Sequence, residues 1–315
     1  MFDLHYDLLT QVYINKDKMA ELKNNFNKIY NEKNIIGGIF NLFYMSPKEM
    51  KDELNINPNE INIIENLKEV NSLIEKYELI PKKIKYIIGI EGLDYLEKIE
   101  DIDILYELGV RSTNIVWNNN NKFGGGARGD KRQGLTKLGE QLIKKIVQKN
   151  IAIDLSHANI KTFYGIIEKC QELKNEGFNP IVFASHSNSR KICNVPRNLT
   201  DNQIKEISKL GGAIGIVGIK QFCTLKRNVS NYCEEYIKHI NYVRDLLEGT
   251  ENICVSTDNM EYYKIEPEKY KTMNVFKQEN VKEKIEKSLK ENGYTKEIIN
   301  NILYKNFEMK ILQRL

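Results

Sequence analysis

The chain has 315 residues, of which 41% are hydrophobic and 29% are charged, a profile that predicts a soluble globular protein of one large domain or two average ones. The formal net charge of +4 is small for this length, and lysines and glutamates are mixed along the chain. Composition therefore gives no reason to expect a nucleic-acid or membrane surface.

Short β-rich runs alternate with amphipathic helical stretches almost to the end of the chain. Eight strands are predicted, at 2–5, 35–43, 84–90, 111–117, 151–155, 181–184, 212–217 and 253–256. Helical periodicity covers 16–30, 59–77, 137–148, 160–175 and 236–247. A capping box at Thr200 and Gln203 begins another helix. Two further helices are predicted near 281–291 and 295–312.

This alternation favours an α/β fold, a closed (β/α)8 TIM-like barrel that forms one domain over 1–315 with extra C-terminal helices. The alternative is an open doubly wound sheet. Such a sheet usually carries a glycine-rich phosphate turn after its first strand, whereas residues 5–9 read His-Tyr-Asp-Leu-Leu. The longest irregular stretch, 118–134, follows a predicted strand, which is where a barrel carries an active-site loop.

The cysteines and the N-terminus indicate the cellular compartment in which the protein is expected. No apolar run reaches the roughly 18 residues of a membrane span, and the first residues lack the parts of a signal peptide. The five cysteines form no Cys-x-x-Cys pair, and an odd, scattered set indicates reduced thiols. We therefore expect a cytoplasmic protein.

Three of the four histidines, His5, His157 and His186, lie at or just beyond the ends of predicted strands. In a barrel these strand ends meet at one rim, where active sites are built. His5 and Asp7 are two residues apart on one strand, so they share a face and form half of a zinc-type site. Without its context, this pair is more simply explained as a hydrogen-bonded surface pair.

Glu91 ends an apolar strand, where a lone buried carboxylate requires a cation or a base. One carboxylate can bridge two metals, so the candidate ligands divide into two sites that share Glu91. The predicted ligands are His5, Asp7, Glu91, His157 and His186. Two ions about 3.5 to 4 Å apart would activate a bridging water and polarise a carbonyl oxygen. We predict two Zn²⁺ ions, with other divalent ions as the alternative.

Four further residues have two interpretations each. Asp258 closes the last predicted strand and either passes a proton to the leaving amine or caps the next segment. Arg197 either binds a substrate carboxylate or forms a surface salt bridge. Asp154 is either an acceptor for a ligand histidine or an ordinary strand-end residue. His239 lies within a helical stretch, where a structural role is expected over a ligand role.

Several ordered motifs extend from His5 to about Ile311. They are Gly89-Ile-Glu-Gly, Leu108-Gly-Val-Arg, Gly134-Leu-Thr-Lys-Leu-Gly, Ile153-Asp-Leu-Ser-His, Ser185-His-Ser-Asn-Ser-Arg, Cys193-Asn-Val-Pro-Arg-Asn-Leu-Thr-Asp and Gly211-Gly-Ala-Ile-Gly-Ile. In this order they resemble the membrane dipeptidase family, which comprises renal dipeptidase and its bacterial relatives, zinc enzymes of the amidohydrolase superfamily.

The resemblance implies a distorted barrel with two zinc ions. It implies His5 and Asp7 on one ion, His157 and His186 on the other, and Glu91 as the bridge. It also implies that Arg197 binds the free carboxylate of a dipeptide and that Asp258 handles the proton near the metal-bound water. Glu91 and Asp258 are therefore the predicted catalytic residues.

Three of the departures from the family pattern lie near the predicted site. Asp3-Leu-His-Tyr-Asp replaces the usual Asp-Gly-His-x-Asp. Trp117 and Asn118 stand where renal-type members carry a substrate-facing histidine, and we predict that both contact the substrate. Ser256-Thr-Asp-Asn-Met replaces Ser-Asp-Phe-Asp-Gly.

The predicted function is hydrolysis of small dipeptides by a metal-bridging hydroxide. One alternative is another amidohydrolase reaction on the same metals, such as deacylation of N-acyl amino acids or related amides. The other is a non-catalytic relative that binds a peptide, which the complete set of five ligands disfavours. Relatives dimerise, so the resemblance also allows a homodimer.

Overall fold

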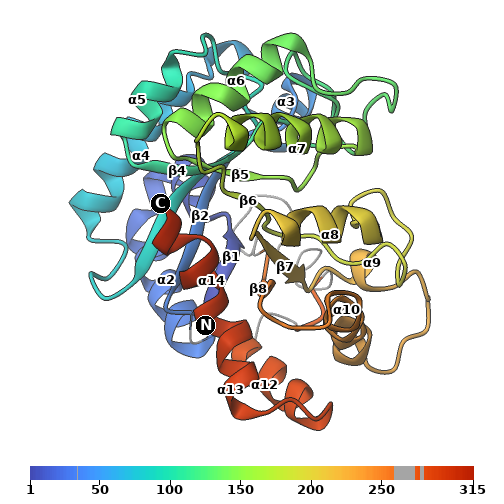
Figure 1. Cartoon of the computed structure of the whole chain (residues 1–315). Coiled ribbons are helices and arrows are strands. Elements are labelled where there is room, and N and C mark those ends of the chain that lie inside the picture. Colours follow the sequence, from blue (N-terminus) through green and yellow to red (C-terminus); the bar gives the residue numbers. More distant parts are fainter. Residues whose placement is uncertain (34, 259–273, 277–279) are drawn as a thin grey trace.

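Eight parallel strands form a single sheet in which each strand pairs with the next in chain order (Figure 1). In this computed structural model, residues 1–33, 35–258, 274–276 and 280–315 are described. The strands are β1 (Phe2–Tyr6), β2 (Gly37–Phe43), β3 (Lys85–Glu91), β4 (Val110–Asn114), β5 (Ala152–Asp154), β6 (Val182–Ala184), β7 (Ala213–Val217) and β8 (Ile253–Ser256). Hydrogen bonds from Thr257 N to Asp3 Oδ1 (2.8 Å) and from Asp258 N to His5 O (3.1 Å) join the end of β8 to β1. The predicted (β/α)8 barrel is thereby confirmed.

Helices surround the strands (Figure 1). They are α1 (Leu8–Ile14), α2 (Met19–Lys33), α3 (Pro47–Leu54), α4 (Ile63–Tyr77), α5 (Asp101–Glu107), α6 (Lys137–Gln148), α7 (Ile160–Asn175), α8 (Asp201–Lys209), α9 (Lys220–Cys223), α10 (Tyr232–Leu247), α12 (Val281–Glu291), α13 (Lys296–Asn300) and α14 (Asn306–Lys310). The predicted capping box is present at Thr200 and begins α8. Within the described ranges, none of the helices combines the length and the hydropathy of a membrane span.

Several bounds differ from the predicted ones by a few residues, and α1, α3, α5 and α9 were not predicted. Two of the differences, at the fourth strand and at the last helix, coincide with particular side-chain contacts. The fourth strand ends at Asn114 instead of 117, because Asn114 Nδ2 donates to Val116 O (3.1 Å) and draws the backbone into a local turn. The last helix is interrupted by a π-helical segment, Asn301–Lys305. Immediately after it, buried Asn306 donates to the carbonyl oxygens of Thr250 (2.7 Å) and Ile253 (2.8 Å), which fixes this helix against the start of β8.

The amino-terminal end of the barrel is filled with apolar side chains. Phe307 of α14 packs against Phe2 of β1 with ring centroids 5.1 Å apart, and Ile311 is fully buried in the same cluster. Inward-facing residues of other strands, such as Phe183 and Ile39, complete this layer. The buried polar side chains at the ends of β1, β3, β5 and β6 lie at the opposite, carboxyl-terminal end. This division places the functional site at the carboxyl rim.

Candidate metal centre

The carboxyl rim brings together all five predicted metal ligands. His5 lies near the end of β1, and Asp7 is the residue at which α1 begins. Glu91 is the last residue of β3. His157 follows β5 and His186 follows β6. All five side chains are buried, so residues from four separate segments of the chain share one enclosed volume.

The Glu91 carboxylate lies between two groups of ligands. Its Oε2 is 3.1 Å from His5 Nε2, which is itself 3.3 Å from Asp7 Oδ1. Its Oε1 is 2.8 Å from His157 Nε2 and 3.6 Å from His186 Nε2. Each carboxylate oxygen therefore faces one of the two groups that the sequence predicted. We call them the acidic half (His5, Asp7 and Asp258) and the basic half (His157, His186 and Arg197).

Several electron-pair donors converge at the centre. His157 Nε2 and His186 Nε2 are only 2.9 Å apart. Among the described residues, His5 Nε2, Asp7 Oδ1 and Glu91 Oε1 are buried and form no hydrogen bond of suitable geometry, although they lie within ion-pair distance of one another or of His157. Unsatisfied buried polar atoms of this kind are rare and costly, and a cation among them would satisfy each one. The donor set therefore fits divalent metal ions that accept imidazole and carboxylate ligands, such as zinc.

Two clusters have ligand atoms close enough for a shared ion. The potential ligand atoms of His5, Glu91 and His186 all lie within 4.8 Å of one another, and so do those of His5, Asp7 and Asp258. Asp258 thus joins the acidic half directly. Its backbone is left-handed (φ 49°), as is that of His157 (φ 71°). Non-glycine residues rarely adopt this conformation, and such strain is concentrated at functional sites.

The histidines of the two halves differ in protonation. Burial disfavours the charged form of His5, but the carboxylates of Glu91 and Asp7 hold its pKa well above the ordinary value. Burial, reinforced by the Arg197 charge, lowers the pKa of His157 to about 3. Burial likewise holds the pKa of His186 well below its ordinary value. The basic half is therefore neutral at its two rings, and their lone pairs are available to a ligand.

Burial raises the pKa of the carboxylic acids in the acidic half, whereas it lowers the pKa of a histidine. Burial raises the pKa of Asp7 to about 7, and it also raises the pKa of Asp258. Glu91 behaves differently, because His5 and His157 outweigh the effect of burial and hold its pKa well below the ordinary value. Among the three carboxylates, Glu91 is therefore the one whose negative charge its surroundings stabilise.

Arg197 supplies a buried cation to the basic half. Its Nη2 donates to His186 Nε2 at 2.7 Å, and its guanidinium lies 5.6 Å from the centroid of the Phe222 ring. Burial lowers the pKa of Arg197 to about 10, so the side chain remains charged at neutral pH. Within the described residues, no carboxylate forms an ion pair with it. The surface salt bridge considered from the sequence is therefore wrong.

A model of the membrane dipeptidase family, peptidase family M19, matches residues 1–314. The chain belongs to this family. Its relatives include an uncharacterized protein in the PQQ-III 3′ region of Acinetobacter calcoaceticus, 34% identical over 173 residues that make up 52% of each chain. Dipeptidase 3 of Mus musculus is 28% identical over 184 residues, which cover 55% of this chain and 34% of the mouse protein. The chain thus spans about half of the first of these relatives and a third of the second.

Two solved structures share the fold over nearly the whole chain. One is a metallo peptidase from Rhodobacter sphaeroides liganded with a phosphinate mimic of the dipeptide L-Ala-D-Ala. It has a TM-score of 0.76 and 19% identity, and the match covers 100% of this chain and 99% of the other. The other is the dipeptidase AC of family M19, with a TM-score of 0.74, 19% identity and coverage of 99% and 97%.

Two residues that follow β4, Trp117 and Asn118, contact the candidate ligand His157. The Trp117 ring stacks on the His157 ring, with centroids 5.5 Å apart and planes inclined by 24°. On its other side Trp117 stacks with Phe43 at 6.0 Å. Asn118 Oδ1 lies 3.0 Å from His157 Nδ1. Both residues predicted to contact the substrate therefore lie at the site, where they also hold His157 in place.

The structure shows the contacts of three further polar residues, two considered from the sequence and one missed. Asp154 bonds to Ser185 and to backbone N–H groups, and no contact with the His157 ring is present among the described residues. His239 is structural, as expected: Ser189 N donates to its Nδ1 (3.1 Å), and its Nε2 lies 2.9 Å from Cys223 O. The sequence analysis missed Asn41, whose amide lies 3.1 Å from His5 Nδ1. An asparagine in the neighbouring apolar strand was the available signal.

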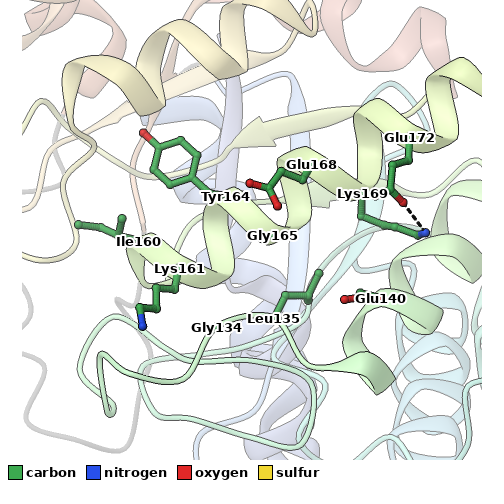
Figure 2. Close-up of a pocket in the computed structure, with 10 residues that line it drawn as sticks. All are labelled: Gly134, Leu135, Glu140, Ile160, Lys161, Tyr164, Gly165, Glu168, Lys169 and Glu172. Carbon is green, nitrogen blue, oxygen red and sulfur yellow. Dashed lines mark hydrogen bonds and ion pairs between the residues drawn. The ribbon is translucent and has the colours of Figure 1, made fainter.

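A surface pocket lies apart from these residues. It has a volume of about 430 Å³ and is lined by side chains of α6, α7 and the segment before α6 (Figure 2). Lys169 pairs with Glu172 at 2.7 Å within it, and Tyr164 lies along the same helix. No residue predicted to act in the metal centre lines this pocket.

Proposed function

We propose that the protein is a dipeptidase that uses two zinc ions to hydrolyse the peptide bond of small dipeptides. The observation that carries this proposal is the position of Glu91, whose two carboxylate oxygens face different ligand groups. A family relative, Dipeptidase 3, is named for this activity, and the Rhodobacter sphaeroides metallo peptidase was solved with a dipeptide mimic. Both names support the assignment of substrate class.

Five side chains would hold the ions. His5 and Asp7 would bind one ion, His157 and His186 would bind the other, and Glu91 would contact both. When bound, such ions supply an activated water and polarise the carbonyl oxygen of the scissile bond. The enclosing side chains keep bulk solvent away, which strengthens every electrostatic interaction inside the centre.

Arg197 would bind the C-terminal carboxylate of the substrate. A guanidinium matches the geometry of a carboxylate and forms charge-assisted hydrogen bonds with it. Arg197 is buried, carries its charge at neutral pH, and has no carboxylate partner among the described side chains. A substrate carboxylate at this place would compensate the buried charge, so substrates that end just past the scissile bond are favoured.

Asp258 would take a proton at a carboxylate oxygen and pass it to the leaving amine. Its carboxylate lies within 4.8 Å of the ligand atoms of His5 and Asp7, and burial raises its pKa. A carboxylate with a raised pKa is a better proton acceptor than an exposed one. This role places proton transfer in the acidic half and carboxylate binding in the basic half.

A substrate panel tests the proposal. The purified, zinc-loaded protein is incubated with L,L and L,D dipeptides, the same dipeptides amidated at the C-terminus, and N-acetyl amino acids. We expect hydrolysis of free dipeptides and little hydrolysis of the amidated forms. Preferential cleavage of N-acetyl amino acids would replace the dipeptidase with a deacylase. Zinc binding with no hydrolysis of any compound would favour a peptide-binding relative.

The compartment is part of the proposal. We propose that the protein acts in the cytoplasm, which the five cysteines support because none forms a disulfide. Fractionation of cells that produce the full-length protein, followed by immunodetection, tests this assignment. Recovery in a membrane or secreted fraction would contradict it.

A further inference from the structure

The hydroxyl group of Ser185 lies between two of the candidate ligands. Ser185 immediately follows β6 and precedes His186, and it is 1% exposed. Its Oγ is 2.6 Å from His186 Nδ1 and 3.1 Å from His5 Nδ1. The same oxygen is 2.5 Å from Asp154 Oδ2. Ser156 Oγ is farther from it, at 3.5 Å. At shorter distances, the Ser185 oxygen thus contacts two ligand rings and one buried carboxylate.

Hydrogen-bond counting assigns the direction of these three contacts. A serine hydroxyl has one hydrogen to donate and two lone pairs that accept. Asp154 receives backbone N–H groups at its other oxygen, from Ser156 (3.0 Å) and from Ser185 (2.9 Å), as a carboxylate does. Ser185 therefore donates its hydrogen to Asp154. Its two lone pairs remain to accept from the Nδ1–H groups of His5 and His186.

This direction places a hydrogen on Nδ1 of both rings. A neutral imidazole that carries its hydrogen on Nδ1 presents a lone pair at Nε2. The Nε2 atoms of His5 and His186 are the atoms that face the Glu91 carboxylate, at 3.1 and 3.6 Å. For His186 the assignment agrees with a second contact, because Arg197 Nη2 donates to the same Nε2 at 2.7 Å.

We propose that Ser185, held by Asp154, is a shared positioning residue that orients one histidine in each half of the metal centre. This inference rests on the proposed function, because it concerns the same ligands. Outer partners of this kind fix ring orientation and raise ligand basicity. Asn41 Nδ2 lies 3.1 Å from His5 Nδ1, so the Asn41 amide would accept a hydrogen from this ring only in the reversed orientation, with its oxygen toward His5.

The third ligand histidine has a separate partner, which provides an internal comparison. His157 Nδ1 lies 3.0 Å from Asn118 Oδ1 and has no contact with Ser185 among the described residues. Loss of the Ser185 hydroxyl should therefore weaken metal binding in both halves. Loss of the Asn118 amide should weaken it in the basic half alone.

The first test measures zinc affinity. Zinc-free full-length protein is prepared by dialysis against a chelator, checked for folding by circular dichroism, and titrated with zinc in competition with a chromophoric chelator. We expect Ser185→Ala to bind both zinc equivalents about 10- to 100-fold more weakly than wild type. Asn118→Ala should weaken one equivalent. Ser185→Cys, which preserves the side-chain size but bonds weakly, should behave like Ser185→Ala and replaces it if the alanine variant does not fold.

The matched control is Ser187→Ala. Ser187 is as buried as Ser185, but its hydroxyl contacts only Ser156 Oγ, at 3.5 Å, among the described contacts. Its variant should bind zinc as wild type does. Unchanged affinity in folded Ser185→Ala and Ser185→Cys would overturn the role of Ser185, while the metal centre would stand. A wild-type protein that binds no zinc would instead overturn the proposed function.

The second test reads the tautomers directly in zinc-free wild-type protein. Nuclear magnetic resonance of ¹⁵N-labelled histidine separates Nδ1–H from Nε2–H rings, and single substitutions assign the signals. We expect an Nδ1–H form for the neutral ring of His186, and a shift toward mixed tautomers in Ser185→Ala. A His186 ring that carries its hydrogen on Nε2 in the wild type would contradict the inference.

Discussion

The two halves of the metal centre contain the same type of ligand in opposite electrostatic surroundings. His5 lies beside two carboxylates, which hold its pKa well above the ordinary value. His157 lies beside Glu91 and the Arg197 charge, and its pKa falls to about 3 mainly because of burial. Residue type therefore does not determine the charge of these rings. The elements that the barrel brings next to each ring determine it.

The two halves also have different proposed tasks, proton transfer and carboxylate binding. The acidic half contains the carboxylate that would handle a proton, Asp258, whereas the basic half contains the guanidinium that would bind a carboxylate, Arg197. Glu91 belongs to both because each of its oxygens faces a different half. Substitutions in the bridge should thus affect both tasks, and substitutions within one half should affect one.

The largest effect is expected for Glu91→Gln, which neutralises the bridge. Both halves lose a charged ligand, so we expect metal affinity to fall by more than about 100-fold, beyond the range typical of outer partners, and turnover to fall with it. Zinc content after dialysis and the rate of dipeptide hydrolysis are the measurements. A variant that keeps full zinc and the full rate would show that the bridging assignment is wrong.

Asp258→Asn, a substitution in the acidic half, should lower turnover while metal remains bound. The amide is nearly isosteric but cannot take a proton, so we expect kcat to fall by about 10² to 10⁴-fold. Zinc content and KM should change little. If kcat is retained in the fully zinc-loaded variant, another residue performs the proton transfer.

Arg197→Gln should affect the basic half in a different way. Removing a charged hydrogen-bond donor costs about 1.5 to 3 kcal/mol, so we expect KM for free dipeptides to rise by about 10- to 150-fold. C-terminally amidated dipeptides should be insensitive to the change. Arg132→Ala is the control, because Arg132 pairs with Asp130 on the exposed surface (2.7 Å). An equal KM effect on free and amidated substrates would count against carboxylate recognition.

The smallest effect on turnover is expected for His239→Gln, a variant of a buried histidine outside both halves. Burial lowers the pKa of His239 to about 4, from a model-peptide value of 6.5. Between pH 4 and pH 6.5, the unfolded chain therefore binds more protons at this histidine than the folded protein does. The neutral, buried His239 consequently contributes its full stability above about pH 6.5, and this contribution is lost as the pH falls toward 4.

The wild-type free energy of unfolding should thus fall relative to that of His239→Gln by up to about 3 kcal/mol between pH 7 and pH 4. Urea unfolding of zinc-free protein at both pH values measures the difference. A gap between the two proteins that does not change with pH would show that His239 titrates normally in the folded state.

The alternation of strands and helices and the candidate ligands at the rim could be predicted because both depend on local patterns. The apolar runs near Phe2, Ile87 and Val182 alternate with helical periodicity, and each rim histidine or carboxylate follows such a run. The predicted bounds of α6, α7 and α12 agree with the structure. The early end of β4 was missed because an asparagine side chain, Asn114, competes for the backbone there.

By itself, the sequence determined the alternation of elements and the kinds of atoms available at the rim. It also indicated which residues come together, since parallel strands of a barrel end on one side. The tertiary structure decided which oxygen of Glu91 faces which histidine. It also decided that Ser185 contacts both the adjacent His186 ring and the ring of His5, which is 180 residues away in the chain. Such contacts depend on side-chain direction and on the burial of unlike charges, and neither is encoded in the spacing of residues along the chain.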